Sequence, residues 1–134
     1  MTHTGGCHCG AIRYEVSGDA KHVALCHCSD CRLSSGAPMV AWAAFDEAQL
    51  KLIKGEATIF NSSGSAMRSF CPKCGSGLCY RNEEFLPGIV DIQCATFDDP
   101  EAFSPQVHIQ VADRINWMKT AHELPAFDRF PSQS

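Results

Sequence analysis

The 134-residue sequence has no long hydrophobic run and no excess of positive charge. No segment approaches the roughly 20 consecutive apolar residues that a membrane span requires, and the N-terminal stretch MTHTGGCHCG has neither the basic nor the apolar region of an export signal. Eleven Lys and Arg residues stand against fifteen Asp and Glu residues, so no overall positive field exists to bind phosphates. These absences predict a cytoplasmic protein without a membrane or nucleic-acid partner.

The sequence also lacks internal repeats and low-complexity tracts. A chain of this length, with 45% hydrophobic residues, can build one core without outside help. We therefore expect residues 1–134 to form a single domain, with PSQS at 131–134 as its frayed end. The pattern does not indicate an oligomeric state.

Short runs rich in β-branched or aromatic residues predict a mainly β fold with little helix. Gly, Asp, Asn and Ser separate these runs and are typical of turns. The expected strands are AIRYEV (11–16), MVAWAAF (39–45), LKLIKG (50–55), ATIFNS (57–62), GLCYR (77–81), GIVDIQC (88–94) and VHIQVA (107–112). Short helices are expected at SDCRLSS (29–35) and DEAQL (46–50).

Cysteine, in contrast, is abundant, with nine residues in the chain. Cytosolic thiols are kept reduced and the count is odd, so metal ligands or a reactive thiol explain these residues better than disulfides. Seven of the nine fall into three groups: Cys7 and Cys9; Cys26, Cys28 and Cys31; Cys71 and Cys74. Cys79 and Cys94 stand alone in strand-like segments, where we interpret them as small hydrophobic core residues.

The seven grouped cysteines divide naturally into four and three. Two pairs are followed at once by glycine, in GGCHCGA and FCPKCGSG, which is typical of zinc knuckles because glycine permits the tight turn. We call these residues, Cys7, Cys9, Cys71 and Cys74, the four-cysteine cluster, and Cys26, Cys28 and Cys31 the three-cysteine cluster. Four thiolates complete a closed structural zinc site, whereas three leave one position for water or a substrate such as a thiol.

Other assignments remain open at this point. CPKCG also resembles the knuckles of rubredoxins, so iron is an alternative for the four-cysteine cluster. Lys73 or Arg68 would offset the negative charge of its four thiolates or simply lie exposed to solvent. His27, His8 or His108 could complete a purely structural site at the three-cysteine cluster. Asp30 and Arg32 flank Cys31 and would orient a ligand there or simply lie at the surface.

The order GGCHCGAIRYEV, CHCSDCRLSSGA, FCPKCGSGL, VHIQVADRINWM and LPAFDRFP resembles the glutathione-dependent formaldehyde-activating enzyme family over roughly residues 3–128. The family shares its domain with centromere protein V, whose basic extension has no counterpart here. The resemblance implies a β-sheet fold similar to that of small zinc-binding accessory proteins of Rab GTPases. It also implies two Zn²⁺ ions per chain, one structural at the four-cysteine cluster and one catalytic at Cys26, Cys28 and Cys31.

For activity, the resemblance implies a zinc-dependent carbon-sulfur lyase that forms or cleaves S-hydroxymethylglutathione. The small-molecule partner would then be glutathione or its aldehyde adduct. Candidates to bind the glutathione carboxylates are the cations near the clusters, Arg13, Arg32, Arg68 and Lys73, on grounds of charge and position alone. The alternative is a non-catalytic zinc domain that binds a thiol ligand or a protein partner, because no general base is recognisable beside the three-cysteine cluster.

Overall fold

The computed structural model describes residues 1–131, and the rest of the expected frayed end, 132–134, lies outside the described residues. The strands are β1 (Thr2–Gly6), β2 (Arg13–Ser17), β3 (His22–Cys26), β4 (Val40–Asp46), β5 (Leu50–Lys54), β6 (Thr58–Ser63), β7 (Ala66–Phe70), β8 (Gly77–Arg81), β9 (Ile89–Gln93) and β10 (Val107–Ile109). The helices are α1 (Ser29–Ser35) and the short 3-10 helices η1 (Glu47–Gln49), η2 (Cys94–Thr96), η3 (Val111–Asp113) and η4 (Asn116–Glu123). Across these residues, no helix is both long enough and apolar enough to cross a membrane.

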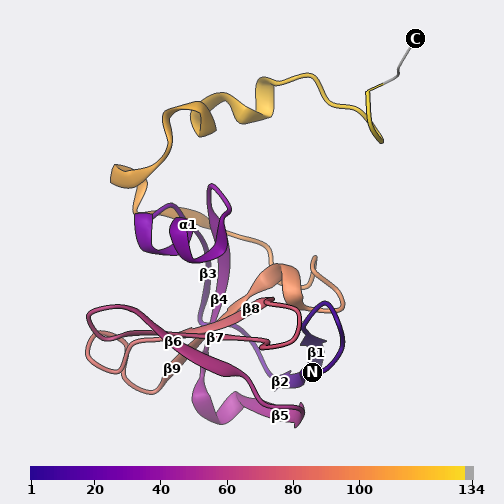
Figure 1. Cartoon of the computed structure of the whole chain (residues 1–134), viewed down its shortest axis with the longest axis vertical. Helices are drawn as coiled ribbons and strands as arrows, with labels where there is room; N and C mark the ends of the chain where they lie inside the picture. The colour runs from indigo at the N-terminus through magenta and orange to yellow at the C-terminus, as the bar shows by residue number, and fades with distance from the viewer. Residues whose placement is uncertain (132–134) are drawn as a thin grey trace.

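The strands form two sheets (Figure 1). The smaller sheet has the order β1-β2-β5, and the larger sheet has the order β10-β3-β4-β9-β8-β7-β6. Neighbouring strands are antiparallel except β10, which pairs parallel with β3. Strand β6 therefore lies at one edge of the larger sheet.

The main core lies where the two sheets pack together. Val16 of the smaller sheet and Phe45, Val90 and Ile92 of the larger sheet have no exposed surface. Complete burial of such side chains stabilises the fold by about 1.5–3 kcal/mol each. A second, smaller core beneath α1 consists of Cys26, Cys31, Val40 and Trp42, and it places two cysteines of the three-cysteine cluster against the larger sheet.

The prediction of a mainly β fold is confirmed. Strands β4, β5, β6, β8 and β9 and helix α1 fall where the sequence pattern predicts them. Helix α1 ends as expected from its sequence, because Gly36 adopts φ 74° and its backbone N–H donates to the Arg32 carbonyl. The expected helix at 46–50 is the single 3-10 turn η1.

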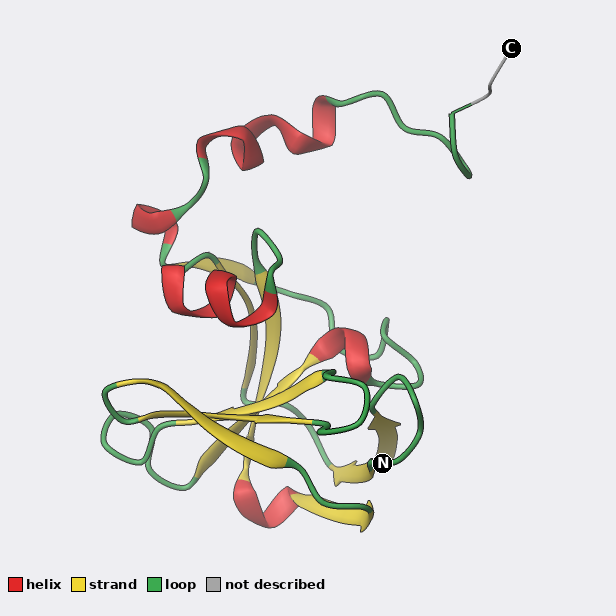
Figure 2. Ribbon diagram, in the orientation of Figure 1, coloured by secondary structure: helices red, strands yellow, loops and turns green. Residues whose placement is uncertain are grey.

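The sequence pattern missed three strands and extended a fourth. Strand β1 reads THTGG and β7 reads AMRSF, and neither alternates apolar and polar residues; the apolar run of β3 was also missed. The predicted strand 107–112 is wrong beyond Ile109, because Gln110 adopts a positive φ of 56° and the chain then turns into η3. Beyond η3 the chain leaves the sheets (Figure 2).

Candidate metal centres

The four-cysteine cluster forms where two turns meet, one between β1 and β2 and the other between β7 and β8. Its four sulfur atoms all lie within 4.8 Å of one another. The Sγ atoms of Cys7 and Cys9 are 3.7 Å apart, and those of Cys9 and Cys71 are 3.8 Å apart. The prediction that these two distant pairs come together is confirmed.

Backbone geometry shapes both turns of this cluster. Ile12 donates its N–H to the Cys7 sulfur at 3.2 Å, and Gly75, with φ 80°, donates its N–H to the Cys71 carbonyl at 2.8 Å. The Ser76 hydroxyl lies 3.3 Å from the Cys74 sulfur and, together with the Ser76 backbone, lowers the pKa of that thiol to about 5. Backbone N–H groups and the Ser76 hydroxyl thus stabilise negative charge on the sulfurs of this cluster.

The spacing of the sulfurs fits a tetrahedral metal ion. A tetrahedron with Zn–S bonds of about 2.3 Å has sulfur–sulfur edges of about 3.8 Å, which matches the distances from Cys9 to Cys7 and to Cys71. All nine cysteines are free thiols. The four sulfurs of this cluster are therefore available to bind a metal ion.

The three-cysteine cluster lies at the junction of β3 and α1. Cys26 ends β3, Cys28 is the N-cap residue of α1, and Cys31 is in the first turn of that helix. The Cys28 sulfur accepts a hydrogen bond from the Cys31 N–H at 3.3 Å, and all three sulfurs lie within 4.8 Å of one another. The helix cap therefore holds the cluster together, and the three sulfurs could also hold a metal ion.

Arg68 reaches this cluster from β7. Its Nη2 lies 3.5 Å from the Cys31 sulfur and 2.7 Å from an Asp30 carboxylate oxygen, and its Nε donates to the Ser62 hydroxyl at 2.8 Å. The guanidinium also stacks 4.9 Å from the centre of the Tyr80 ring. A hydrogen bond from Cys26, aided by the Arg68 cation, lowers the pKa of Cys31 to about 5 against the opposing effect of burial.

Arg68 is therefore placed differently from the sequence-based expectation. We expected it beside the four-cysteine cluster, but it contacts the three-cysteine cluster, because strand register places it opposite Tyr80 and next to α1. Asp30 does orient a group at this cluster, since it pairs with Arg68. Arg32 instead donates to the Asp113 carbonyl at 3.3 Å, and Arg13 pairs with Asp98.

A row of side chains crosses the larger sheet beside the cluster. Phe60 pairs with Arg68, Arg68 with Tyr80, and Tyr80 with Asp91, so the four residues share one face of strands β6 to β9. Asp91 is buried, and its Oδ1 has no hydrogen-bond partner among residues 1–131. Burial raises the pKa of Asp91 to about 6. Sequence reasoning missed Asp91, because an Asp in a predicted strand gives no sign of which face it occupies.

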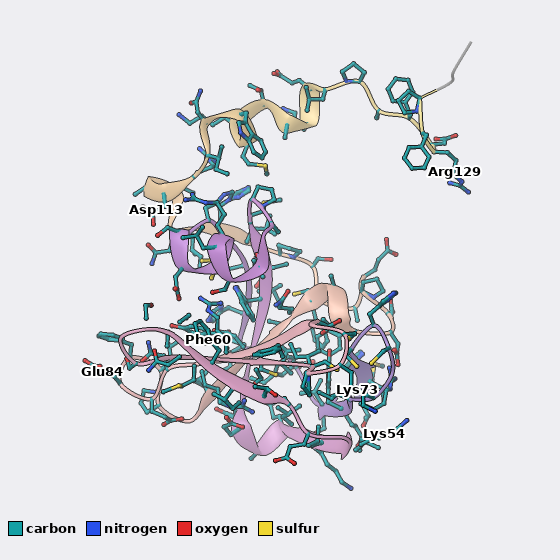
Figure 3. The ribbon with its side chains drawn as sticks, viewed as in Figure 1. Lys54, Phe60, Lys73, Glu84, Asp113 and Arg129 are labelled. Atoms are coloured by element: carbon teal, nitrogen blue, oxygen red, sulfur yellow. The ribbon has the colours of Figure 1, made fainter. Side chains whose placement is uncertain are left out.

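A cavity of about 520 Å³ opens beside the three-cysteine cluster. Its lining includes Cys31 and Arg68, the apolar side chains of Trp42 and Phe60, and Gly75 of the β7–β8 turn. Figure 3 shows Phe60 on the side of β6 that faces α1. The three-cysteine cluster thus borders a space that could receive a small molecule.

The histidines considered as a fourth ligand are placed elsewhere. His27 Nε2 lies 2.9 Å from His108 Nδ1, and neither ring joins the group of sulfurs within the described part of the chain. His8 contributes its backbone N–H to the Ser76 hydroxyl. Cys79 and Cys94 are buried, and burial raises the pKa of each thiol to about 11, as expected for core residues.

Fold and site together define a cysteine-rich, mainly β protein with two thiol clusters, each able to hold a metal ion. The sequence model of the glutathione-dependent formaldehyde-activating enzyme family matches residues 2–113, a segment that contains both clusters. The chain therefore belongs to the glutathione-dependent formaldehyde-activating enzyme family.

Two individual proteins are similar to this chain. A protein of Halomonas elongata, named provisionally as a glutathione-dependent formaldehyde-activating enzyme, is 25% identical over 145 residues, covering 100% of this chain and 92% of that protein. A crystal structure of a Rhodobacter sphaeroides protein superposes with a TM-score of 0.63 at 25% identity, covering 78% of this chain and 98% of that one. The second comparison supports the mainly β fold.

Proposed function

We propose that the protein is a zinc-dependent carbon-sulfur lyase that forms or cleaves S-hydroxymethylglutathione or a related thiol-aldehyde adduct. The observation that carries the proposal is the open side of the three-cysteine cluster. Within residues 1–131 its three sulfurs have no histidine or fourth cysteine beside them, and Cys31 borders the 520 Å³ cavity. The match to the family supports the choice of glutathione and formaldehyde as substrates.

The two clusters suit different zinc roles. The four sulfurs of the four-cysteine cluster would hold a structural ion, because they complete a tetrahedron and join turns from opposite halves of the family segment. Cys26, Cys28 and Cys31 would hold the catalytic ion. When bound there, zinc stabilises an incoming thiol as thiolate near neutral pH.

The side chains beside the cavity would hold the reacting groups. In the forming direction, the thiol of glutathione loses its proton, its sulfur attacks the carbonyl carbon of formaldehyde, and the carbonyl oxygen takes up a proton to give the hydroxymethyl group. Arg68, fixed by Asp30 and Ser62, provides a cation in the lining of the cavity. Trp42 and Phe60 give it apolar walls against which the substrate can be oriented.

Exchange NMR on purified protein with glutathione and formaldehyde tests this function. We expect exchange between free formaldehyde and the adduct to be faster than in buffer, and a Cys28→Ala variant to lose the acceleration. The matched control is Cys94→Ala, which removes a buried thiol outside both clusters. If the wild-type rate equals the buffer rate, this substrate assignment is wrong.

A second candidate is a non-catalytic zinc domain that binds a thiol ligand or a protein partner. The observation that favours it is the pairing of Asp30, the residue that precedes Cys31, with Arg68 and Ser62, which leaves its carboxylate no freedom to act as a base. X-ray absorption at the zinc edge separates the two. A fourth sulfur that appears on addition of glutathione, together with faster exchange, supports the enzyme, whereas a fourth sulfur without faster exchange supports the binding domain.

A further inference from the structure

The C-terminal arm, residues 114–131, stands away from both sheets (Figures 1 and 2). None of its residues is buried, although several are large and apolar. The exposed fractions are 59% for Trp117, 58% for Phe127 and 93% for Phe130. The arm nevertheless has regular structure, because η4 spans Asn116–Glu123. A short helix with its aromatic residues in water needs another surface to stabilise it.

Only the base of the arm is fixed to its own chain. Asp113, just before the arm, accepts the Ser29 N–H at 3.2 Å and, through its carbonyl, a bond from Arg32. Ile115 and Trp117 then line a shallow hollow against α1. Beyond this point, through residue 131, the hydrogen bonds stay within the arm. Figure 3 shows Asp113 beside α1 and Arg129 far from it.

The body of the molecule carries an uncovered apolar face close to where the arm leaves. Strand β6 is an edge of the larger sheet, and its Ile59 and Phe60 are 55% and 57% exposed. Leu33 of α1, 79% exposed, lines the same cavity as Phe60. Ile59 precedes Phe60 in the strand and so points to the other side of the sheet, where it lines a different cavity. We call Leu33 and Phe60 the α1–β6 face. An apolar edge strand of this kind is normally covered to prevent uncontrolled pairing.

We propose that the C-terminal arm of one copy covers the α1–β6 face of a second copy, and that the exchange is reciprocal. The occupant is a second copy because each chain carries both an uncovered arm and an uncovered face. The arm runs outward from the body instead of back across its own β6. The arm leaves the body beside α1, so the arm and the α1–β6 face lie on the same side of the molecule. Two copies related by a two-fold axis can therefore exchange arms and form a closed dimer.

The available area matches the size of a stable dimer. At 150–250 Å² per aromatic ring, the exposed parts of Trp117, Phe127 and Phe130 present about 400 Å² on each arm. Two arms therefore contribute about 800 Å², which is half of the roughly 1,600 Å² that a standard specific interface buries in total. The family match ends at residue 113, just before the arm, so the arm lies outside the matched segment whereas the face that it covers lies within it.

Covering this face has a consequence for the cavity beside Cys31. Leu33 and Phe60 form part of its lining, so the arm of the second copy would close it from solvent. The dimer itself does not depend on the proposed activity, because it follows from apolar surfaces alone.

Sedimentation equilibrium of the full chain tests the assembly. We expect the wild type to have twice the 14.6 kDa mass of one chain, and the double variant Trp117→Ser/Phe127→Ser, like Phe60→Ser, to shift to one chain mass. The matched control is Phe85→Ser, which removes a still more exposed ring (72%, against 57% for Phe60) from the β8–β9 loop and should remain a dimer. Circular dichroism and zinc content show whether each variant is folded. A monomeric wild type, or a folded arm variant that stays dimeric, would overturn the proposal.

Photo-cross-linking identifies the surface that the arm covers. Phe127→p-benzoylphenylalanine is prepared in isotope-labelled chains and mixed with unlabelled full-length protein before irradiation. We expect cross-links between labelled and unlabelled chains, at residues of α1 or β6. Cross-links confined to one chain would show that the arm folds onto its own body, and cross-links to the exposed Leu52 or Ile53 of β5 would show a different face. Either result would overturn the proposal.

Discussion

The four-cysteine and three-cysteine clusters differ in how the chain supports them. The sulfurs of the first come from two turns more than sixty residues apart, and backbone N–H groups and the Ser76 hydroxyl stabilise them. The sulfurs of the second come from six consecutive residues, and the side chains of Arg68 and Asp30 stabilise the cluster from outside. The first cluster therefore can form only together with the fold, whereas the second is built on a fold that already exists.

The two clusters also differ in what lies next to them. The three-cysteine cluster borders a cavity and a row of ionisable side chains, among them Arg68 and Asp91. At the four-cysteine cluster, the hydrogen bonds to the sulfurs come from the Ile12 N–H and the Ser76 hydroxyl, which keep their charge over the working pH range. Ionisable groups beside a cavity are typical of chemistry, and main-chain donors are typical of a structural site. The following predictions test this contrast.

Loss of one ligand from the four-cysteine cluster should have the largest effect. We expect Cys71→Ala to unfold or aggregate, because a structural zinc contributes on the order of 10 kcal/mol and a domain of this size has only about 5–15 kcal/mol of net stability. Circular dichroism and elemental analysis of the soluble fraction measure the result. Cys79→Ala, which also removes a buried thiol, is the control and should stay folded with both metals.

Loss of one ligand from the three-cysteine cluster should abolish activity but not the fold. We expect Cys28→Ala to give a folded protein with one zinc fewer and no acceleration of formaldehyde exchange. The physical reason is that its partners Cys26 and Cys31 belong to a core with Val40 and Trp42, which packs without a metal ion. If Cys28→Ala and Cys71→Ala behave alike, the division into a structural and a catalytic cluster is wrong.

Arg68 should act as a positioning residue for the three-cysteine cluster. Arg68→Lys keeps the charge but loses the planar fork that joins Asp30, Ser62 and Cys31. We expect kcat/KM to fall about 10- to 100-fold, as is typical when a partner of a metal ligand is changed, with zinc content unchanged. After Cys26, the hydrogen bond from Arg68 also lowers the pKa of Cys31, and the lysine loses this bond, so the loss should be greatest at the acidic end of the pH–rate profile.

Arg81→Lys provides the matched control for this substitution. Arg81 is half-buried, whereas Arg68 is buried, but it is likewise paired with a carboxylate, Glu47, and it lines a different cavity. An equal loss of activity in both variants would show a general effect of arginine removal and contradict the assigned role.

The sequence predicted the parts of the site that local chemistry determines. Glycine after Cys9 and Cys74, and the short spacing within each group, were enough to predict both clusters, because turns and helix caps depend on neighbouring residues. The same reasoning placed Arg68 at the wrong cluster, since its position is set by the register of β7 with β8. The orientation of Asp91 and the detached arm likewise depend on tertiary packing, which periodicity does not report.

The smallest effect should come from Asp91, an ionisable side chain on the sheet beside the three-cysteine cluster. Burial raises the pKa of Asp91 to about 6, so the folded state favours the protonated acid. Its contribution to stability is present at low pH and is lost as the pH rises from the ordinary value of 3.8 through about 6. Asp91→Asn, which cannot ionise, should therefore be more stable than the wild type by about 1–2 kcal/mol above this range.

Urea unfolding of both proteins near pH 5 and near pH 8 measures this difference. The advantage of Asp91→Asn should be present at the higher pH and shrink at the lower one, because the wild-type carboxyl is then largely protonated. Asp19→Asn, at an exposed position, should give no such change. An advantage that is the same at both pH values, or that grows toward acid, would mean that Asp91 is ionised at little cost in the folded protein. The ionisable side chains that distinguish the three-cysteine cluster from the four-cysteine cluster would then be limited to Arg68 and Asp30.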